Sequence, residues 1–325
     1  MTIIRMGVHA LLGIAVLATS DVSIAADAYP SKPIRIIVAY PAGGANDIVA
    51  RSIGSELSKT LGQSVVIDNM SGAAGSIGAG YVANAPADGY TLLMAAGAHA
   101  LAPSLRKELP YDMVKSFAPI SLAAIGAYVL TVNPQVKANN VQELIALAKA
   151  NPGKLNFASS GVGAPPYLAA VVFEKMTGTQ MTHVPYRGDA DANAALLAGQ
   201  VDLLFASLGP TIPLIQSGKL RALAVTTAKR TNVMPELPTL SESGLNGYAI
   251  GTWWGLVAPA GTPKPVIDRL AAAMAKATAS APQKARFAKL GVEAQGDTPA
   301  QFAALINHDM ASYAQMTKAA GVEKE

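Results

Sequence analysis

Two glycine-rich turns have the residue types and spacing to bind an anion through the backbone. In the first, an apolar, β-branched run at residues 34–40 predicts a buried strand, Pro41 ends it, and Gly43 and Gly44 lead into a helix. Glycine leaves the backbone open to a ligand, and a helix start offers unpaired N–H groups and the positive end of the helix dipole. The pattern therefore predicts a site for a negatively charged group, although a strand-to-helix turn that binds nothing would look the same.

The polar side chains of the first turn have a different role from its glycines. Asn46 or Asp47 can cap the helix that follows. Asp47 is acidic in a site proposed for anions, so we expect it to cap the helix or pin the loop rather than touch the ligand. The candidate binding residues of this turn are Tyr40, Pro41, Ala42, Gly43, Gly44, Asn46 and Asp47.

The second glycine-rich turn, at residues 159–164, also lies between a predicted strand and a predicted helix. Further polar residues follow neighbouring strands. Because open α/β sheets bind ligands at the carboxyl ends of their parallel strands, we expect these positions to meet at one edge of a sheet. The candidate binding residues outside the first turn are His99, Ser159, Ser160, Gly161, Gly163, Tyr186, Arg187, Gly188 and Ser207.

Each of these positions also has a purely structural explanation. The two serines of the second turn can serve only as helix caps. Arg187 can be a solvated loop residue or pair with Asp189, and His99 can be a packed, hydrogen-bonded core residue. Trp253 and Trp254 fall on alternate faces of one predicted strand, so at most one of them borders a cleft.

Other kinds of chemistry have little support in the sequence. The histidines beyond the first residues are not spaced as metal ligands, the chain has no cysteine, and no G-x-S-x-G or P-loop pattern occurs. The S-x-x-K match at residues 104–107 lacks its companion motifs. Gly75, Gly78 and Gly80 follow the second predicted strand in the order G-x-x-G-x-G, which favours close helix packing, or a wall of the anion pocket, over nucleotide binding. We therefore expect no catalytic residue, no metal and no cofactor.

The first residues have the pattern of an export signal. Residues 1–5 carry one positive charge, residues 10–18 are small and apolar, and small residues suited to cleavage lie between Ala25 and Ala28. The apolar run is shorter than the ~20 residues of a membrane span. We therefore predict a cleaved signal peptide over residues 1–28 and export to the periplasm.

Composition narrows the class of protein further. Charged residues make up 14% of the chain, hydrophobic residues make up 51%, and the formal net charge is +4. These values support substantial cores and argue against disorder. Lys and Arg are scattered, and no basic run is interleaved with aromatic residues, so nucleic acid is not an expected partner. The absence of cysteine fits an oxidising compartment in which the fold is stable without disulfides. We also expect a monomer.

Strands and helices are predicted to alternate in two series, the arrangement of an α/β fold with parallel strands. The second series includes a helix at residues 141–150, which Asn151-Pro-Gly ends, and a further strand follows at residues 251–259. Two or three helices between residues 265 and 320 are expected to close the chain.

The two series predict two lobes. A long apolar run at residues 117–133, interrupted by Gly126, is the natural crossover from the first lobe to the second, and a later strand leads back. We therefore assign residues 29–126 and 227–325 to lobe 1 and residues 127–226 to lobe 2, joined as a hinged shell.

Several of these segments closely resemble, in order, the solute-binding proteins of tripartite tricarboxylate transporters, the TctC-like Bug family. The resemblance covers essentially the whole chain after the signal peptide, so it is more specific than any one glycine motif. The matching segments are residues 30–51, 69–78, 87–94, 155–163, 183–188, 197–202 and 254–263.

The resemblance implies a two-lobed periplasmic binding protein of the Venus-flytrap, type II-like fold, each lobe a mostly parallel sheet flanked by helices, and no catalysis. It implies that residues 41–47 hold one carboxylate through backbone N–H groups and ordered water. Residues 159–163 and 186–188 would complete the site from the other lobe. One segment departs from the family pattern, because residues 165–167 are Pro-Pro-Tyr where many members have polar residues, often His.

The predicted function is capture of a small mono- or dicarboxylate, aromatic ones included, and its delivery to the permease subunits of a tripartite tricarboxylate transporter. Tyr167 and the two prolines before it would suit an apolar ligand body, whereas Arg187 would suit a second carboxylate. Two alternatives from other classes remain: an exported α/β hydrolase, and a ligand sensor for a membrane receptor that uses the same closure.

Overall fold

The predicted first strand forms as β1 (Ile34–Val38), and its side chains alternate between two cores. Ile36 belongs to the core on one face of the sheet and Ile37 to the core on the other, which explains why the run is apolar throughout. The computed structural model describes residues 29–161, 164–319, 321–322 and 324. The predicted signal peptide therefore lies outside the described residues.

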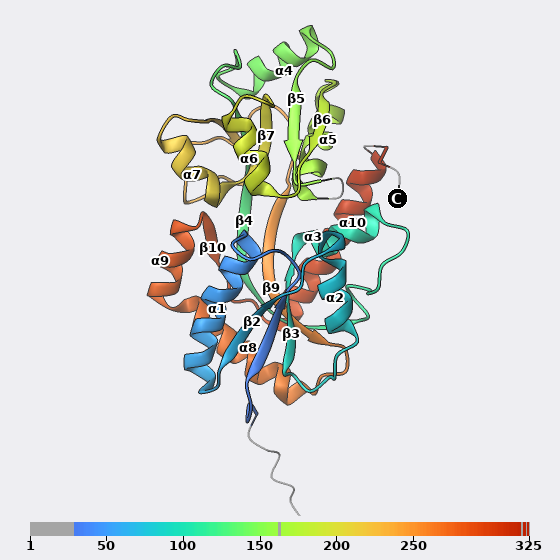
Figure 1. Ribbon diagram of the computed structural model, residues 1–325, viewed down its shortest axis with the longest axis vertical. Helices are drawn as coiled ribbons and strands as arrows, with labels where there is room; N and C mark the ends of the chain where they lie inside the picture. Colours follow the sequence, from blue (N-terminus) through green and yellow to red (C-terminus); the bar gives the residue numbers. More distant parts are fainter. Residues whose placement is uncertain (1–28, 162–163, 320, 323, 325) are drawn as a thin grey trace, which may run out of the picture.

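Two lobes are stacked along the longest axis of the molecule (Figure 1). The elements of lobe 1 are β1, α1 (Ala45–Leu61), β2 (Val65–Asn69), the 3₁₀ helix η1 (Ala73–Gly75), α2 (Ser76–Ala83), β3 (Thr91–Ala96), α3 (Gly97–Leu105), β9 (Gly251–Pro259), α8 (Lys264–Ala279), α9 (Ala281–Lys289), β10 (Val292–Ala294) and α10 (Pro299–Ala319). The elements of lobe 2 are α4 (Val141–Ala150), β5 (Asn156–Ser159), α5 (Pro165–Thr177), β6 (Thr182–Pro185), α6 (Asp189–Leu197), β7 (Leu203–Ser207), α7 (Leu208–Gln216) and β8 (Arg221–Val225).

One long strand, β4 (Phe117–Val132), belongs to both lobes. Its first part pairs with β9 as far as Ala127, and from Tyr128 onward it pairs with β7 and then also with β8. The strand does not break at Gly126, contrary to the sequence prediction. A Cβ at Gly126 would lie 2.9 Å from the ring of Trp254, so the glycine makes room for that ring inside a continuous strand.

The α/β class is confirmed, but the sheets are mixed rather than mostly parallel. The strand order is β2-β1-β3-β9-β4-β7-β5-β6, with β8 and β10 also pairing with β4. The pairs β1–β2, β1–β3, β5–β6 and β5–β7 are parallel, whereas every pair that involves β4 or β9 is antiparallel. The physical reason is that β4 leaves lobe 1 while β9 re-enters it, so the two neighbours run in opposite directions.

A second connection between the lobes is tied to β4 by Thr226. Its buried Oγ accepts a hydrogen bond from Tyr128 N–H at 3.2 Å and donates to the Ile250 carbonyl at 2.5 Å. Residues 227–250 then pack on lobe 2, where, for example, Tyr248 Oη donates to the Ala169 carbonyl at 2.6 Å. We propose that the chain returns to lobe 1 at residue 251 rather than at residue 227. Hydrogen bonds to residues far away in the sequence hold residues 227–250 on lobe 2.

Helices cover both faces of each sheet, as the two cores of lobe 1 require. One face of lobe 1 packs on α1, α8 and α9, and the other packs on α2, α3 and α10. In lobe 2, α4 and α5 lie on one face and α6 and α7 on the other. Within the described residues, none of the helices combines the length and hydropathy of a membrane span.

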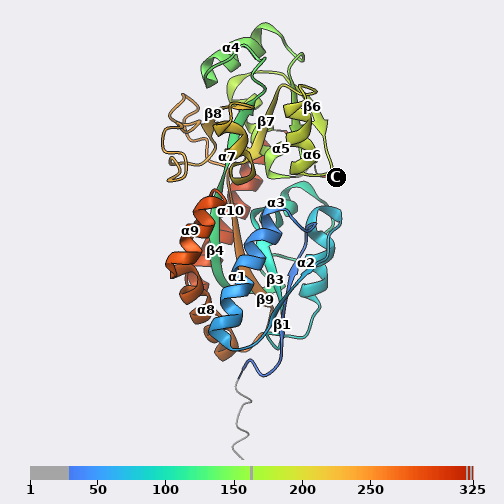
Figure 2. The same ribbon diagram turned by 60° about the vertical axis from the view of Figure 1, so that its left-hand side comes forward.

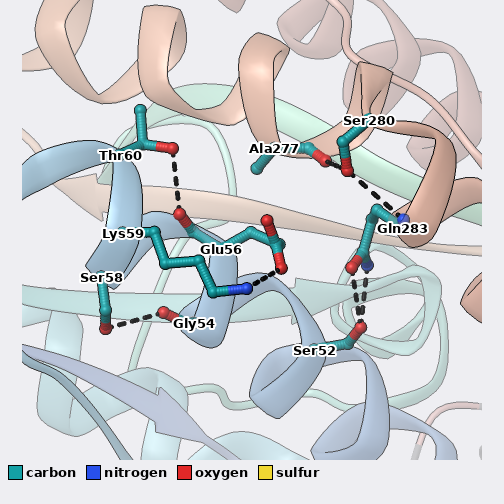
Figure 3. Close-up of polar contacts among 9 residues, drawn as sticks. All are labelled: Ser52, Gly54, Glu56, Ser58, Lys59, Thr60, Ala277, Ser280 and Gln283. Atoms are coloured by element: carbon teal, nitrogen blue, oxygen red, sulfur yellow. Dashed lines mark hydrogen bonds and ion pairs between the residues drawn. The ribbon is translucent and has the colours of Figure 1, made fainter.

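A buried polar pair fixes α1 against α9 on the face opposite α3 (Figure 3). Ser52 Oγ lies 2.8–3.0 Å from the two side-chain atoms of the Gln283 amide, and both side chains are almost fully buried. Gln283 is held in turn by Ser280, the N-cap of α9, which accepts its backbone N–H at 3.3 Å. Because α1 begins at the first glycine-rich turn, this contact also fixes the helix end that faces lobe 2.

The lobes also touch at two glycines that the sequence analysis did not single out. Gly209, near the start of α7 in lobe 2, lies directly against the Leu290 carbonyl and Gly291, which follow α9 in lobe 1. A Cβ on Gly291 would lie 2.6 Å from Gly209 Cα. The carbonyl at the end of one helix thus points at the start of another, a favourable arrangement of helix dipoles across the lobe interface.

We expect Gly209→Ala to push the lobes apart at this corner. Alanine favours the helix locally, but its Cβ would overlap the Leu290 carbonyl, so we expect a loss of about 1–3 kcal/mol in the free energy of unfolding and a larger radius of gyration. Denaturant unfolding and small-angle X-ray scattering measure the two effects. Gly54→Ala is the control, because its Cβ would contact only side chains within lobe 1; a Gly209→Ala protein that matches wild type in both measurements contradicts the contact.

Candidate ligand-binding site

The first glycine-rich turn forms an open helix start at the edge of lobe 1. Gly43 has φ +83°, which glycine adopts without strain, and Gly44 is the N-cap of α1. No side chain caps this helix, so the N–H groups of Ala45 and Asn46 have no hydrogen-bond partner among the described residues. Residues 41–44 are exposed. Exposed, uncapped N–H groups at the positive end of a helix are what an anion requires.

Asp47 pins the loop, as the sequence predicted, but neither Asp47 nor Asn46 is the N-cap. The Asp47 carboxylate is 3% exposed and accepts hydrogen bonds from Gly43 N–H at 3.0 Å, Arg51 Nε at 2.9 Å and Asn69 Nδ2 at 2.9 Å. Burial raises the pKa of this carboxyl, but these three donors outweigh it and hold the pKa below its usual value. All three hydrogen bonds to Asp47 come from the protein itself. Asp47 therefore holds the loop in place, and we do not expect it to touch the ligand.

Asn46 is fixed by the return strand of lobe 1. Its Oδ1 accepts a hydrogen bond from Trp254 Nε1 at 2.8 Å, which leaves its backbone N–H as its contribution to the open helix start. Trp253 lies on the opposite face of β9, where Nε1 donates to Asp309 at 2.8 Å. Both tryptophans are buried, and they belong to different cores, as the alternation predicted.

A strained loop follows β2 beside the first turn. Ala73 and Ala74 have φ +46° and +52°, a region that costs energy for residues with a Cβ. Tyr40 links this loop to the first turn, because its Oη donates to the Ala74 carbonyl at 3.4 Å. Close packing explains Gly78, whose Cβ would lie 2.8 Å from the Met70 carbonyl.

His99 is a core residue rather than a cleft residue. It is fully buried, its Nδ1 accepts the Ala96 N–H at 3.0 Å, and its ring packs edge-on against Tyr40 and Tyr111. Its Nε2 has no hydrogen-bond partner among the described residues and lies next to Gly75. Burial lowers the pKa of His99 to about 4, although the backbone groups of Ala96 and Gly75 raise it, so the ring is neutral at pH 7. His99 therefore packs against Tyr40 and next to Gly75, and so supports the strained loop from the protein core.

In lobe 2, Ser159 and Gly161 form the junction after β5. Ser159 is fully buried, and its Oγ accepts the Gly161 N–H at 3.1 Å and lies 2.7 Å from His183 Nε2. Gly161 has φ +111°, and the neighbouring Ser160 is partly exposed. Gly163 lies outside the described residues. Ser159 thus shapes the loop, while Ser160 and the backbone remain available to a ligand.

His183 is a residue of this junction that the sequence analysis dismissed with the metal ligands. Its ring stacks on Phe157 with centroids 4.9 Å apart and lies 4.8 Å from the ring of Tyr167. Burial lowers its pKa. Its position on β6, beside the end of β5, is decided by strand pairing and could not be read from local spacing.

The three predicted residues of the turn after β6 have three different environments. Tyr186 N–H donates to the Ser159 carbonyl at 2.9 Å, which joins this turn to the second junction, and Gly188 is the N-cap of α6. The Arg187 side chain is 94% exposed and pairs with Asp191 at 3.1 Å, rather than with Asp189. Asp191 lies four residues along the same helix face, within easy reach of an arginine.

Ser207, at the end of β7, donates to Asp189 Oδ2 at 2.8 Å. The junctions after β1, β5, β6 and β7 all lie at the ends of strands that point toward the gap between the lobes, as Figures 1 and 2 show. The side chains of Arg51, Asn69, His183 and Asp189 contact predicted site residues, although the sequence analysis did not count them among the candidates. A signal for Asn69 was its position directly after a predicted strand.

The described residues contain no group of three or more His, Cys, Asp or Glu side chains placed to hold a metal ion. The junctions at the facing edges of the two lobes carry backbone N–H groups, hydroxyls, aromatic rings and the Asp189 carboxylate. Two α/β lobes joined by crossing strands, with such junctions at their facing edges, have the architecture of a solute-binding protein.

The chain belongs to the family of tripartite tricarboxylate transporter receptors, whose model, TctC, matches residues 49–322. BugT of Bordetella pertussis is 33% identical over 318 residues, which cover 97% of each chain. A protein encoded between tcbD and tcbE in Pseudomonas sp. strain P51 is 37% identical over 302 residues, which cover 92% of this chain and 90% of that one. The resemblance expected from the sequence is therefore confirmed.

Solved structures agree with this assignment. The periplasmic binding protein BugD superposes with a TM-score of 0.84 and 37% identity over 91% of this chain and all of its own. Rpa4515 of R. palustris with adipate gives a TM-score of 0.86 at 33% identity, covering 91% of this chain and 100% of that one. MatC of Rhodopseudomonas palustris with bound malate gives 0.81 at 31% identity, covering 89% and 99%. The family consists of solute-binding receptors.

We expect acid to destabilise the protein partly through His99. Between the unfolded pKa near 6.5 and the folded value of about 4, only the unfolded state binds the proton, so the free energy of unfolding falls as the pH falls through this window. The full contribution is about 3 kcal/mol.

His99→Asn should remove this component, so the stability difference between wild type and variant should shrink as the pH falls from 6.5 to 4. Urea unfolding at several pH values measures it. His308→Asn, at an exposed position of α10, is the control. A wild-type-to-variant difference that is constant with pH would argue against a buried neutral histidine.

Proposed function

We propose that this protein is a periplasmic solute-binding protein that captures a small carboxylate between its lobes and delivers it to the permease of a tripartite tricarboxylate transporter. The observation that supports this most directly is the uncapped start of α1, where N–H groups without a partner among the described residues follow the exposed Gly43 and Gly44. Adipate and malate, both dicarboxylates, are bound to two structural relatives of the chain. The protein holds its ligand without transforming it.

The proposed carboxylate lies against the N–H groups of Ala45 and Asn46 on lobe 1. From lobe 2, Ser160 and Gly161 approach it at the second junction, with Tyr186 beside them. The helix dipole and the N–H donors favour the negative charge, and closure removes competing water. Micromolar affinity corresponds to about −8 kcal/mol, which a few charge-assisted hydrogen bonds in a water-poor cleft can supply.

Capture proceeds by closure of the two lobes about β4 and the Thr226 connection. The ligand favours the closed form only through contacts that both lobes make at once, because equal affinity for the open and closed forms would shift nothing. Closure also gives the membrane partner a shape that differs between loaded and empty protein. Periplasmic location follows from the family and from the predicted signal peptide, and we propose a monomer.

A thermal-shift screen of carboxylates, neutral amides of the same acids, and sugars tests the function. A carboxylate at 100 times its dissociation constant stabilises the folded state by about 2.7 kcal/mol, which corresponds to an increase of several degrees in melting temperature. We expect stabilisation by at least one carboxylate and none by its amide. Stabilisation by uncharged sugars alone, or turnover of a bound acid, would contradict the proposal.

Gly44→Leu tests the first junction. Gly44 has φ −78°, and a Cβ there would approach only the Pro41 carbonyl, at 3.6 Å, so leucine should fold normally while its side chain covers the helix start. We expect at least a tenfold loss of affinity for the best carboxylate, measured by calorimetry, with the free energy of unfolding of the ligand-free protein unchanged. Wild-type affinity in this variant would place the ligand elsewhere.

A further inference from the structure

One carboxylate, that of Asp189, lies at the edge of lobe 2 that faces lobe 1. It is the first residue of α6, directly after the turn at residues 186–188, and its Oδ2 accepts the Ser207 hydroxyl at 2.8 Å. Ser207 is opposite Tyr128 in the β4–β7 pairing, at the point where β4 passes between the lobes. Figures 1 and 2 both place this end of α6 next to the gap between the lobes.

The surroundings of Tyr128 connect this carboxylate with lobe 1. Burial raises the pKa of the Tyr128 phenol, the Thr252 hydroxyl lowers it, and the charges of Asp189 and Tyr313 raise it further. Thr252 lies on β9 and Tyr313 on α10, both in lobe 1. Through its bond to Ser207, which is opposite Tyr128, the Asp189 carboxylate lies near the part of β4 that passes between the lobes.

No cation neutralises Asp189. Among the ion pairs of the described residues none includes it, because Arg187, the nearest basic residue in the chain, turns outward to Asp191. Within the part of the chain that the structure describes, the only hydrogen bond to its side chain comes from a neutral hydroxyl. One turn along α6, Asn193 is 9% exposed and its Oδ1 has no hydrogen-bond partner among the described residues. The Asp189 carboxylate is therefore matched by one neutral donor and by no cation among the described residues, and the unpaired Asn193 oxygen is buried.

Such a surface distinguishes between ligands by charge. In a closed cleft, a second carboxylate placed near Asp189 is repelled, whereas an ammonium group makes a charge-assisted hydrogen bond. A fixed like charge of this kind is a common way to reject the wrong ligand.

We propose that Asp189 selects ligands that carry an ammonium group in addition to the carboxylate, so that the ligand class is amino acids rather than plain dicarboxylates. This inference rests on the proposed function. The carboxylate of the ligand lies against the start of α1, and its ammonium group is directed to Asp189, with the Ser207 hydroxyl holding the Asp189 carboxylate in place.

Matched ligand pairs test the inference by calorimetry: aspartate against succinate, glutamate against glutarate, phenylalanine against 3-phenylpropionate, and aminobenzoate against benzoate. For wild-type protein we expect the amino member of at least one pair to bind ten times or more tightly than its partner, with malate weaker than aspartate. Asp189→Asn should bring that ratio close to one by weakening the amino member alone.

Asp191→Asn is the matched control, because it removes the same charge two residues further along α6 from an exposed carboxylate; it should keep the preference. Ser207→Ala keeps the Asp189 carboxylate but removes the hydroxyl that holds it in place, so it should reduce the preference without abolishing it. The melting temperature of each ligand-free variant shows that it is folded. The inference is overturned if the plain acids or malate bind wild type as tightly as the amino acids, or if Asp189→Asn leaves the ratio unchanged. If the members of these pairs do not bind but another plain carboxylate does, the inference alone fails; if only uncharged ligands bind, the proposed function fails together with it.

Discussion

The interaction on which the site depends is the set of hydrogen bonds to the Asp47 carboxylate. Gly43 N–H, Arg51 and Asn69 all donate to it, so the first turn, the first helix and the second strand are fixed at one point. Because Asp47 is occupied inside the helix rather than at its N-cap, the first N–H groups of α1 stay uncovered. A carboxylate of the protein thus holds open the helix start that we propose for the carboxylate of a ligand. The buried contact of Ser52 with Gln283 keeps the same helix in position.

Closure has to preserve this geometry while the lobes move. The two connections between the lobes meet at Thr226, whose hydroxyl bonds to β4 and to the residue before β9, so the connections are tied together at one point. At the other side, Gly209 and the Leu290 carbonyl set how closely the lobes approach. These contacts lie outside the ligand site, yet they decide whether the two junctions can reach the same ligand.

The charges on α6 are divided between the outside and the cleft. Asp191 pairs with Arg187 on the exposed side, and Asp189 bonds to Ser207 on the cleft side, although the two acids are only two residues apart. Residues two apart on a helix point in different directions, so their roles separate. The arginine that the sequence offered for a second carboxylate is thereby drawn away from the cleft, and an acidic group takes the inner position.

The sequence by itself determined the family, the alternation of elements and the position of the two glycine-rich junctions proposed as the binding site, because apolar periodicity, glycine turns and helix starts are local signals. The helix Val141–Ala150 and the strand Gly251–Pro259 form over the predicted residues for this reason. Only the tertiary structure decided which groups meet. The antiparallel crossing of β4 and β9, the attachment of residues 227–250 to lobe 2, the burial of His99 and the contact of Ser159 with His183 all join residues far apart in the chain. A local pattern shows which interactions a side chain can make but does not show which partner it meets in the folded protein. At Arg187, Asp189 and Asp191 the partner decides whether the charge is paired on the surface or bonded to Ser207.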